Sequence, residues 1–249
     1  MKIIGVIPAR YASSRFPGKP LAKILGKEML AWVIEGARQS KILAEVLVAT
    51  DDPRIFDLAL RCGAKARMTD SDLPSGTDRI HAAVVNEACD WVLNLQGDEP
   101  LLSGALVDQL AEPLLKAPAD LKMATLGHRI SPEELASPHS VKVLCDQFSN
   151  AIYFTRFPAP FSRETIPEQK EIASSVVLKH VGMYAYRKDF LTQFCRSPQA
   201  FLEKAEALEQ LRAPHLGAKI RVIEVQEKSW GVDTPDDIKK IEALMRNAK

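Results

Sequence analysis

The chain has 249 residues, 46% of them hydrophobic, and its 33 Lys and Arg residues against 32 Asp and Glu residues leave a formal net charge of +1. This length accommodates one large α/β domain or two small ones, with enough apolar residues for a full core. The charge balance argues against a nucleic-acid polyanion or a membrane surface as partner, and no apolar run approaches a membrane span.

The cysteines and the first residues indicate the compartment. Cys62, Cys89, Cys145 and Cys195 are widely spaced and match no metal-ligand or redox pattern. The opening MKIIGVIPARY has an apolar stretch too short for a signal peptide. We therefore expect reduced thiols in a cytoplasmic protein that neither inserts into membranes nor binds nucleic acid.

Apolar runs and helical patterns alternate through the first half of the chain. Ile3, Ile4, Val6 and Ile7 form a β-branched run typical of a buried strand. Strands that alternate with helices predict right-handed crossovers, and therefore an α/β fold with a mostly parallel sheet and helices on both faces. The expected elements are strands at 3–7, 46–49, 65–68 and 91–95, and helices at 28–40, from Pro53, around 80–84 and at 103–115.

The second half of the chain is less regular. Several predicted strands follow one another without a full helix between them, and 157–171 carries prolines typical of a surface loop. We see no low-complexity linker or repeat, and predict a single domain, 1–249, with an inserted, partly antiparallel lobe at about 125–190. The lobe could be a substrate lid or a dimer contact. Strands are expected at 122–126, 141–145, 151–154, 181–186 and 220–225, and one or two helices at 199–212.

A basic loop, PARYASSRFPGKPL, follows the first predicted strand. It carries Arg10, Arg15 and Lys19 among small residues and prolines. Small residues allow backbone N–H groups to approach a ligand, and the cations suit phosphate oxygens. Ligands of open α/β sheets bind beyond the carboxyl ends of the strands, where this loop emerges. The alternative is a solvated basic loop without a ligand.

Two acidic residues could supply a matching metal site. Asp98 follows the predicted strand at 91–95, after Gly97, which permits an unusual backbone turn. Asp233 stands just before a near capping box made by Thr234 and Asp237, so the helix start does not account for its charge. Mg²⁺ is commonly bound by one or two carboxylates together with substrate phosphates. A ligand-free turn is the alternative for Asp98.

Three further clusters have ordinary structural explanations. Ser75 or Thr77 can cap the helix that follows, although a helix N-terminus also suits an anion or polar ligand. His180 lies beside an apolar strand, where a histidine is more often packed than catalytic. The run LEQLR at 208–212 fits an amphipathic helix.

Nine motifs occurring together in order resemble one enzyme family. The chain is similar to the 3-deoxy-manno-octulosonate cytidylyltransferases, or CMP-Kdo synthetases, over about residues 3–242. The resemblance implies a Rossmann-like core and a dimer formed through the inserted lobe. It also implies Mg²⁺-dependent joining of CTP and the sugar acid Kdo into CMP-Kdo and pyrophosphate, which activates the sugar for lipopolysaccharide biosynthesis. The motifs are PARYASSRFPGKPL, ATDD, SGTDR, NLQGDEP, SVKVL, YFTR, HVGMYAYR, LEQLR and GVDTPDDI.

The resemblance also implies roles for individual residues. Asp98 and Asp233 would bind Mg²⁺, and with Arg10 and Lys19 they would be the catalytic residues. Those implied to bind the nucleotide are Arg10, Ser14, Arg15, Lys19, Ser75, Gly76, Arg79 and Gln96. Those implied to line the sugar pocket are Gln96, Arg156, His180, Tyr184, Glu209 and Gln210, with Arg156 facing the sugar carboxylate.

Two departures from the family pattern keep alternatives open. SGTDR replaces the commoner SGTER, and FPAPFSRE after Arg156 differs from the usual stretch, so the sugar could be 8-amino-Kdo. A sialic acid or sugar-1-phosphate nucleotidyltransferase would share the fold, but His180, Tyr184, Glu209 and Gln210 argue against it. A non-enzymatic nucleotide-binding protein would not need both Asp98 and Asp233.

Overall fold

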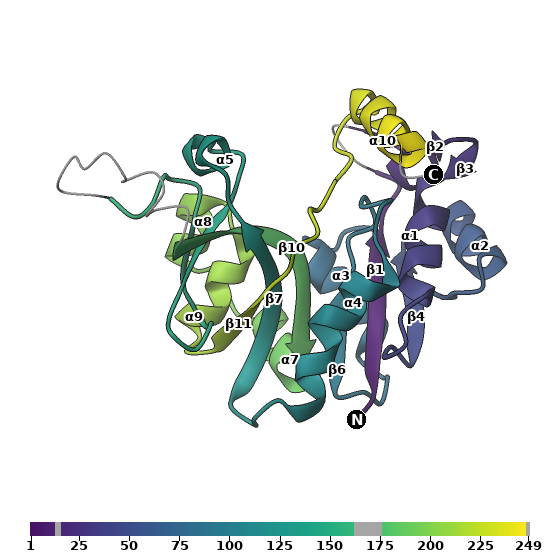
Figure 1. Ribbon diagram of the computed structural model, residues 1–249. Helices are drawn as coiled ribbons and strands as arrows, with labels where there is room; N and C mark the ends of the chain where they lie inside the picture. The colour runs from purple at the N-terminus through teal and green to yellow at the C-terminus, as the bar shows by residue number, and fades with distance from the viewer. Residues whose placement is uncertain (13–15, 162–175, 248–249) are drawn as a thin grey trace. The chain divides into compact units, whose positions relative to one another are not determined.

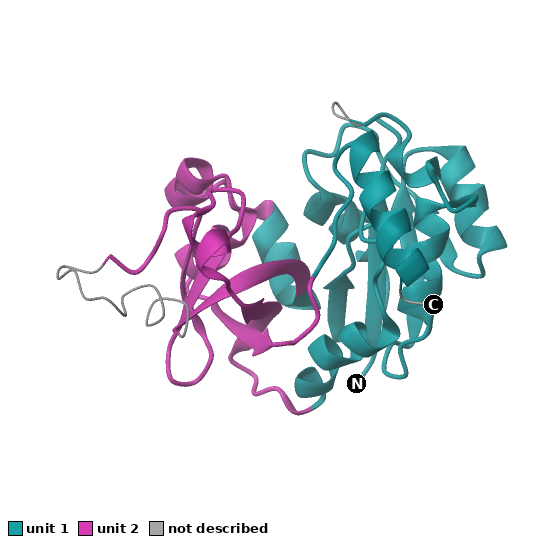
Figure 2. Ribbon diagram, turned by 45° about the horizontal axis from the view of Figure 1, so that its top comes forward, with its two compact units in different colours: residues 1–115, 185–195, 229–249 teal, residues 116–184, 196–228 magenta. Residues whose placement is uncertain are grey.

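The structure, a computed structural model, describes residues 1–12, 16–161 and 176–247, which divide into two compact units (Figures 1 and 2). Unit 1 comprises 1–115, 185–195 and 229–249, and unit 2 comprises 116–184 and 196–228. Unit 2 contains most of the lobe predicted at about 125–190, but it begins earlier and includes a second segment of chain. The assignment of the whole chain to a single domain stays a prediction.

Unit 1 is built on a parallel sheet with strand order β6-β1-β4-β5. Its central strand, β1 (Ile3–Ala9), is the predicted β-branched run, and Ile4, Val6 and Ile7 are fully buried. A strand covered on both faces is expected to be apolar throughout rather than alternating. The other strands are β4 (Glu45–Thr50), β5 (Lys65–Met68) and β6 (Trp91–Asn94).

Helices cover both faces of this sheet. The chain steps from β1 to β4 to β5 in one direction through α1 and α2, and then returns through α3 to β6 on the other side of β1. Because crossovers are right-handed, this reversal places α3 on the face opposite α1 and α2. The α/β fold predicted from the sequence is confirmed. The remaining elements of unit 1 are η1 (Lys19–Leu21), β2 (Lys23–Ile24), β3 (Lys27–Glu28), α1 (Met29–Arg38), α2 (Pro53–Arg61), α3 (Gly76–Val84), α4 (Gly104–Ala111), α7 (Lys188–Arg196) and α10 (Pro235–Asn247).

Unit 2 contains the partly antiparallel lobe. Strands β11 and β7 pair in parallel, whereas β8 pairs antiparallel with both β10 and β9. In the predicted 157–171 loop, 162–171 lie outside the described residues. No helix in the described part of the chain is both long and apolar enough to cross a bilayer. The elements are η2 (Glu112–Lys116), β7 (Leu121–Arg129), α5 (Pro132–Ala136), β8 (Lys142–Cys145), β9 (Ala151–Thr155), β10 (Val177–Arg187), α8 (Phe201–Glu206), η3 (Glu209–Leu211), α9 (Arg212–His215) and β11 (Lys219–Glu224). The unit boundaries fall within η2, β10 and, at its last residue, α7.

We expect Gly36→Ala to lower the free energy of unfolding by about 3 kcal/mol. A Cβ atom at Gly36 in α1 would lie 1.9 Å from the carbonyl oxygen of Leu102, so the helix could not keep its place against that backbone. Urea denaturation would measure the loss. Gly231→Ala is the control, because a Cβ there meets nothing within 4 Å. Equal stability of the two variants would contradict this account of α1.

Candidate active site

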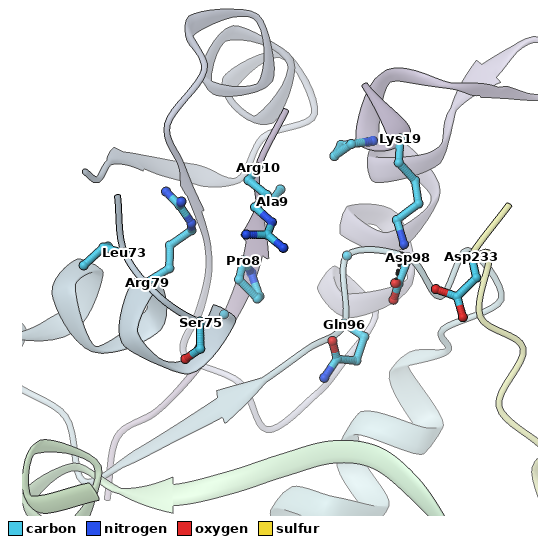
Figure 3. Close-up of a pocket in the computed structure, with 13 residues that line it drawn as sticks. Pro8, Ala9, Arg10, Lys19, Leu73, Ser75, Arg79, Gln96, Asp98 and Asp233 are labelled. Atoms are coloured by element: carbon cyan, nitrogen blue, oxygen red, sulfur yellow. Dashed lines mark hydrogen bonds and ion pairs between the residues drawn. The ribbon is translucent and has the colours of Figure 1, made fainter. Parts of the chain in front are cut away.

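A pocket of about 260 Å³ lies at the carboxyl ends of the unit 1 strands (Figure 3). Strand β1 has β4 on one side and β6 on the other, so the chain changes direction there. Open α/β sheets bind ligands at such a switch point. The pocket is lined by Pro8, Ala9, Arg10, Lys19, Pro20, Leu73, Ser75, Gly76, Arg79, Gln96, Gly97, Asp98 and Asp233.

The lining includes every nucleotide or metal residue predicted above except two. Ser14 and Arg15 lie outside the described residues. Arg10 comes from the end of β1, Lys19 from η1, and Ser75 and Gly76 from the start of α3. The loop after β6 supplies Gln96 and Asp98, and Asp233 precedes α10. Residues far apart in the sequence are therefore brought together.

Lys19 and Asp98 form an ion pair in this pocket. Nζ of Lys19 donates a hydrogen bond of 2.6 Å to Oδ2 of Asp98 and a second, of 2.9 Å, to the main-chain oxygen of Val232. The N–H of Val232 in turn donates to the main-chain oxygen of Asp98 at 2.9 Å. One ammonium group thus ties together η1, the loop after β6 and the segment before α10.

Gly97 allows the loop after β6 to approach β1 closely. A Cβ atom at this position would lie 2.9 Å from the carbonyl oxygen of Pro8. Gly97 lies in a turn, as the sequence predicted, but its φ is outside the left-handed region, so the turn itself does not require glycine. The need for glycine comes from the neighbouring backbone, and it places Asp98 beside the end of β1.

Asp233 lies at the pocket just before α10. The carboxylate of Asp237 accepts hydrogen bonds from the main-chain N–H of Asp233 at 3.2 Å and of Thr234 at 2.9 Å. The Thr234 hydroxyl donates to the same carboxylate at 2.9 Å. The predicted capping box is therefore half formed. The Asp237 carboxylate accepts from the main-chain N–H of Thr234, but the Thr234 hydroxyl donates to that carboxylate. The Asp233 carboxylate faces the pocket (Figure 3).

The donor set at this end of the pocket suits a hard cation. Asp98 and Asp233 supply two carboxylates, and Mg²⁺ is typically held by one or two carboxylates with water and substrate phosphates. The described residues contain no group of three or more His, Cys, Asp or Glu side chains placed to enclose a metal by themselves. The residues thus fit a cation shared with a ligand.

Arg79 differs from the other cations of the pocket because it is almost fully buried. Its Nη2 lies 3.1 Å from Oδ2 of Asp51, and its Nη1 donates to the Thr69 hydroxyl at 2.5 Å. The carboxylate of Asp51 also accepts from the main-chain N–H of Tyr11 at 3.3 Å. Arg79 is therefore neutralised by an internal acid, whereas Arg10 is exposed. The sequence analysis assigned no role to Asp51.

Ser75 caps α3, as the sequence favoured. Its hydroxyl accepts a hydrogen bond from the N–H of Asp78 at 3.1 Å and donates one to the Asp78 carboxylate at 2.7 Å. The hydroxyl proton is thus used within the helix start. Gly76 is the first residue of the helix and lines the pocket with its backbone.

Glu99 is a buried acid that the sequence left without a role. It is 8% exposed, and it accepts a hydrogen bond of 2.6 Å from the Ser229 hydroxyl. Burial raises the pKa of Glu99 to about 7, and the neighbouring charge of Asp98 acts in the same direction. The contact fastens the segment that leads to Asp233 onto the loop that carries Asp98.

Unit 2 gathers three of the predicted sugar residues. The ring of His180 lies against Phe154 and Tyr184, with centroid distances of 5.2 and 5.3 Å. Burial, together with the charge of Glu209, raises the pKa of Tyr184, so that carboxylate lies near the phenol. The structure thus places His180 and Tyr184 in contact, with the charge of Glu209 acting on the phenol, while their role in binding a sugar stays a prediction.

The hydrogen bonds of Thr125 assign the tautomer of His180. The Thr125 hydroxyl donates its single proton to the main-chain oxygen of Met183 at 2.7 Å. It therefore accepts from Nε2 of His180, which lies 3.0 Å away, and leaves Nδ1 as an acceptor. Burial lowers the pKa of His180 to about 3, so the ring is neutral at pH 7.

Gln210 lies in a turn between Glu203 and Arg212, two residues that form a buried ion pair. Arg212 donates to the two carboxylate oxygens of Glu203 at 2.9 and 2.5 Å, and Glu209 lies 3.9 Å from the same guanidinium. Gln210 is 3% exposed, and its Nε2 has no hydrogen-bond partner among the described residues. Since a buried polar atom is costly without a partner, this amide suits a ligand. The one or two helices expected over 199–212 are confirmed, since α8 (Phe201–Glu206) and η3 (Glu209–Leu211) occupy this range.

Arg156 is held at the end of β9 by Glu206 and Pro138. Its main-chain N–H donates to the Glu206 carboxylate at 2.9 Å. Its guanidinium donates to the main-chain oxygens of Glu206 at 3.2 Å and Pro138 at 3.3 Å. The guanidinium is therefore fixed by neutral acceptors and keeps its charge for an anion.

Comparison with known proteins decides the family. A family model described as cytidylyltransferase matches residues 4–222. A 3-deoxy-manno-octulosonate cytidylyltransferase of Bdellovibrio bacteriovorus is 54% identical over 245 residues, 98% of either chain. Another, from Escherichia coli, is 45% identical over 244 residues, which cover 98% of this chain and 96% of that one. The chain belongs to the 3-deoxy-manno-octulosonate cytidylyltransferase family.

Solved structures agree with membership of this family. One described as CMP:2-keto-3-deoxy-manno-octonic acid synthetase complexed with CTP superposes with a TM-score of 0.92 at 44% identity, over 100% of both chains. A cytidylyltransferase of Leptospira borgpetersenii, 17% identical, shares the fold with a TM-score of 0.63 over 99% of this chain and 87% of that one. The resemblance seen in the sequence is thus confirmed, while the individual residue roles and the cytoplasmic location stay predictions.

We expect the stability of the protein to fall on acidification in a way that depends on His180. The unfolded chain takes up a proton on this residue below its ordinary pKa near 6.5, whereas the folded protein does so only near 3. Stability is therefore lost as the pH falls through this window. At pH ~5, wild type should take up about one proton more on unfolding in urea than the His180→Gln variant does. Parallel pH profiles for the two proteins would refute the assignment of a neutral ring.

Proposed function

We propose that this chain joins CTP and Kdo to give CMP-Kdo and pyrophosphate, and so activates the sugar for lipopolysaccharide biosynthesis. The observation that carries the proposal is identity of 54% and 45% over 98% of the chain to two proteins named 3-deoxy-manno-octulosonate cytidylyltransferase. The relative solved with CTP and the cationic pocket of unit 1 support the same nucleotide.

The pocket of unit 1 is the proposed nucleotide site. Arg10 and Lys19 bind the phosphates and neutralise charge that grows on the departing pyrophosphate. Arg15 and Ser14 are proposed to act with them. Gly76 and Gln96 border the nucleoside, while Arg79, neutralised by Asp51, shapes the wall. The protein acts chiefly by positioning the reactants, since phosphoryl transfer requires little covalent chemistry from the enzyme.

Asp98 and Asp233 are the proposed ligands of Mg²⁺. Their support is that the two carboxylates lie in the same pocket as three cationic side chains, Arg10, Lys19 and Arg79. When bound, the ion would screen the phosphates and lower the pKa of the sugar hydroxyl. Glu99, fixed to Ser229, keeps the two ligand-bearing segments together.

The residues gathered in unit 2 are the proposed sugar site. Arg156 binds the carboxylate of the sugar acid, and His180 offers Nδ1 as an acceptor to a sugar hydroxyl. Tyr184, Glu209 and Gln210 contribute further hydrogen bonds, and Gln210 has an unused buried donor that a hydroxyl can satisfy. The anomeric hydroxyl then attacks the α-phosphorus of CTP and releases its proton to solvent. The bond between the α-phosphorus and the oxygen that bridges to the β-phosphate breaks in line, and pyrophosphate leaves.

Release of pyrophosphate tests the proposal. The purified protein would be incubated with Mg²⁺ and CTP plus Kdo, 8-amino-Kdo or N-acetylneuraminate, and with ATP plus Kdo. Rapid release with CTP and Kdo is expected. Faster release with 8-amino-Kdo would mean that this analogue is the preferred sugar, which the unusual FPAPFSRE stretch after Arg156 allows. Absence of release with every pair would favour a nucleotide-binding protein without this activity.

A homodimer formed through unit 2 is part of the proposal. Large apolar side chains are exposed in this unit, including Phe148, Ile152, Phe157 and Phe161 at 63–87%. Ile152 lies on β9, which pairs with β8 alone within the described strands. Such a surface is typical of an interface. In sedimentation experiments, wild type is expected at twice the mass of one chain. The Ile152→Asp variant is expected as a monomer.

A further inference from the structure

Lys142, in the SVKVL motif, is a fully buried lysine at the start of β8. Its Nζ donates to the main-chain oxygens of Ser137 at 2.6 Å, Ser140 at 2.9 Å and Arg156 at 2.7 Å. The three protons of the ammonium group therefore go to three carbonyl groups. Across the described residues, no carboxylate lies within ion-pair distance of this nitrogen. A buried charge without a direct counter-ion is costly, so its retention needs a reason.

The contact at Arg156 places this ammonium beside a second cation. Burial lowers the pKa of Lys142, and the positive charge of Arg156 lowers it further, while Glu206 acts in the opposite direction. Glu206 is held by the Thr155 hydroxyl at 2.7 Å and by the N–H of Arg156 at 2.9 Å. The cluster therefore contains two cations and one anion, which leaves one positive charge for a ligand.

Arg156 itself is anchored on three sides by this cluster. Lys142 holds its main-chain oxygen, the Glu206 carboxylate holds its main-chain N–H, and main-chain oxygens of Glu206 and Pro138 hold its guanidinium. A guanidinium fixed before binding loses less conformational entropy when it meets a carboxylate. The arrangement suits recognition of one planar anion.

We propose that Lys142 is a positioning residue for recognition of the substrate carboxylate: it fixes the backbone of Arg156 and adds a second positive charge behind the guanidinium. The inference rests on the proposed function, in which Arg156 binds the carboxylate of the sugar acid. It assigns to the SVKVL motif a role in binding the acid rather than in packing alone.

Binding of the acid and of its methyl ester separates this role from a structural one. Kd values of Kdo and of the neutral Kdo methyl ester would be measured by calorimetry on folded wild type, Lys142→Met and Lys142→Gln in the presence of CTP without added metal. We expect both variants to bind the acid about tenfold more weakly. The ester, which lacks the charge, should bind all three proteins equally. Lys142→Gln retains two donors for the carbonyl groups, and so tests the charge if Lys142→Met does not fold.

Lys179→Met is the matched control. Lys179 pairs with Lys142 in the antiparallel strands, but its ammonium binds Glu134 at 2.8 Å instead of Arg156. This variant removes the same charge and should bind the acid as wild type does. Equal weakening of acid and ester in a Lys142 variant, or unchanged binding of the acid, would overturn the inference. Failure of wild type to bind Kdo at all would instead reject the proposed function.

Discussion

Replacing either Asp98 or Asp233 by Asn is expected to lower kcat by roughly 10²–10³-fold, because each variant removes one of the two carboxylates proposed to hold Mg²⁺. The fold should persist, since neither carboxylate belongs to the core. Because both residues act on one ion, the double variant should be little worse than either single variant. Steady-state pyrophosphate release at saturating CTP and Kdo gives the three rate constants.

A metal-binding measurement and a control variant support this comparison. Mn²⁺ binding in the presence of CTP, followed by electron paramagnetic resonance, should weaken in both single variants. Asp236→Asn is the matched control, because Asp236 is three residues from Asp233 but is exposed and pairs only with Lys239 at 3.4 Å in the described structure. Normal turnover and metal dependence in Asp233→Asn, or multiplicative losses in the double variant, would remove the shared-metal assignment.

Lys19→Ala is expected to lower kcat by about 10²-fold or more if the ammonium meets charge that grows on the departing pyrophosphate. Its Nζ already lies in the pocket, held by Asp98 and the main-chain oxygen of Val232. Rate constants from single-turnover experiments with radiolabelled CTP would show whether the chemical step is slowed. A variant with normal kcat and only a raised KM for CTP would mean that Lys19 contributes uniform binding.

Lys23→Ala controls for the loss of positive charge near the nucleotide. Lys23 is exposed on β2, four residues along the chain, and does not line the pocket. We expect its kcat and KM to equal those of wild type. A loss similar to that of Lys19→Ala would attribute the effect to long-range electrostatics rather than to contact with the phosphates.

The sequence predicted the parallel half of the fold because its signals there are local. The β-branched run in β1, the cap formed by Asp52 and Pro53 before α2, and the cap at Ser75 each leave a pattern within a few residues. Helix α7 was missed, although Phe190, Leu191 and Phe194 recur at helical spacing, because it follows β10 with no turn residue between them. The boundaries of unit 2 depend on contacts between distant segments of the chain, and the periodicity of apolar residues does not predict such contacts.

The same distinction applies to the candidate site. Residues that recur in family motifs, such as Asp98 and Asp233, could be named from the sequence, and the structure places both at one pocket. The supporting roles of Asp51, Thr125 and Glu206 could not be predicted, because these residues act through hydrogen bonds to partners 28 to 58 residues away. Even Asp51, which belongs to the ATDD motif, carries no local signal that it pairs with Arg79.

The ion pair between Lys19 and Asp98 links the binding of two ligands. The ammonium of Lys19 lies 2.6 Å from Oδ2 of Asp98, so a metal ion bound to this carboxylate would compete with the lysine for it. In the proposed site, an arriving triphosphate would attract the lysine away from Asp98 and would supply further oxygens for the metal. The ligand that binds first must supply the free energy that displaces Lys19 from Asp98. The second ligand then binds without this cost, so nucleotide and metal should show positive heterotropic coupling. By reciprocity, each should raise the affinity of the protein for the other by the same factor.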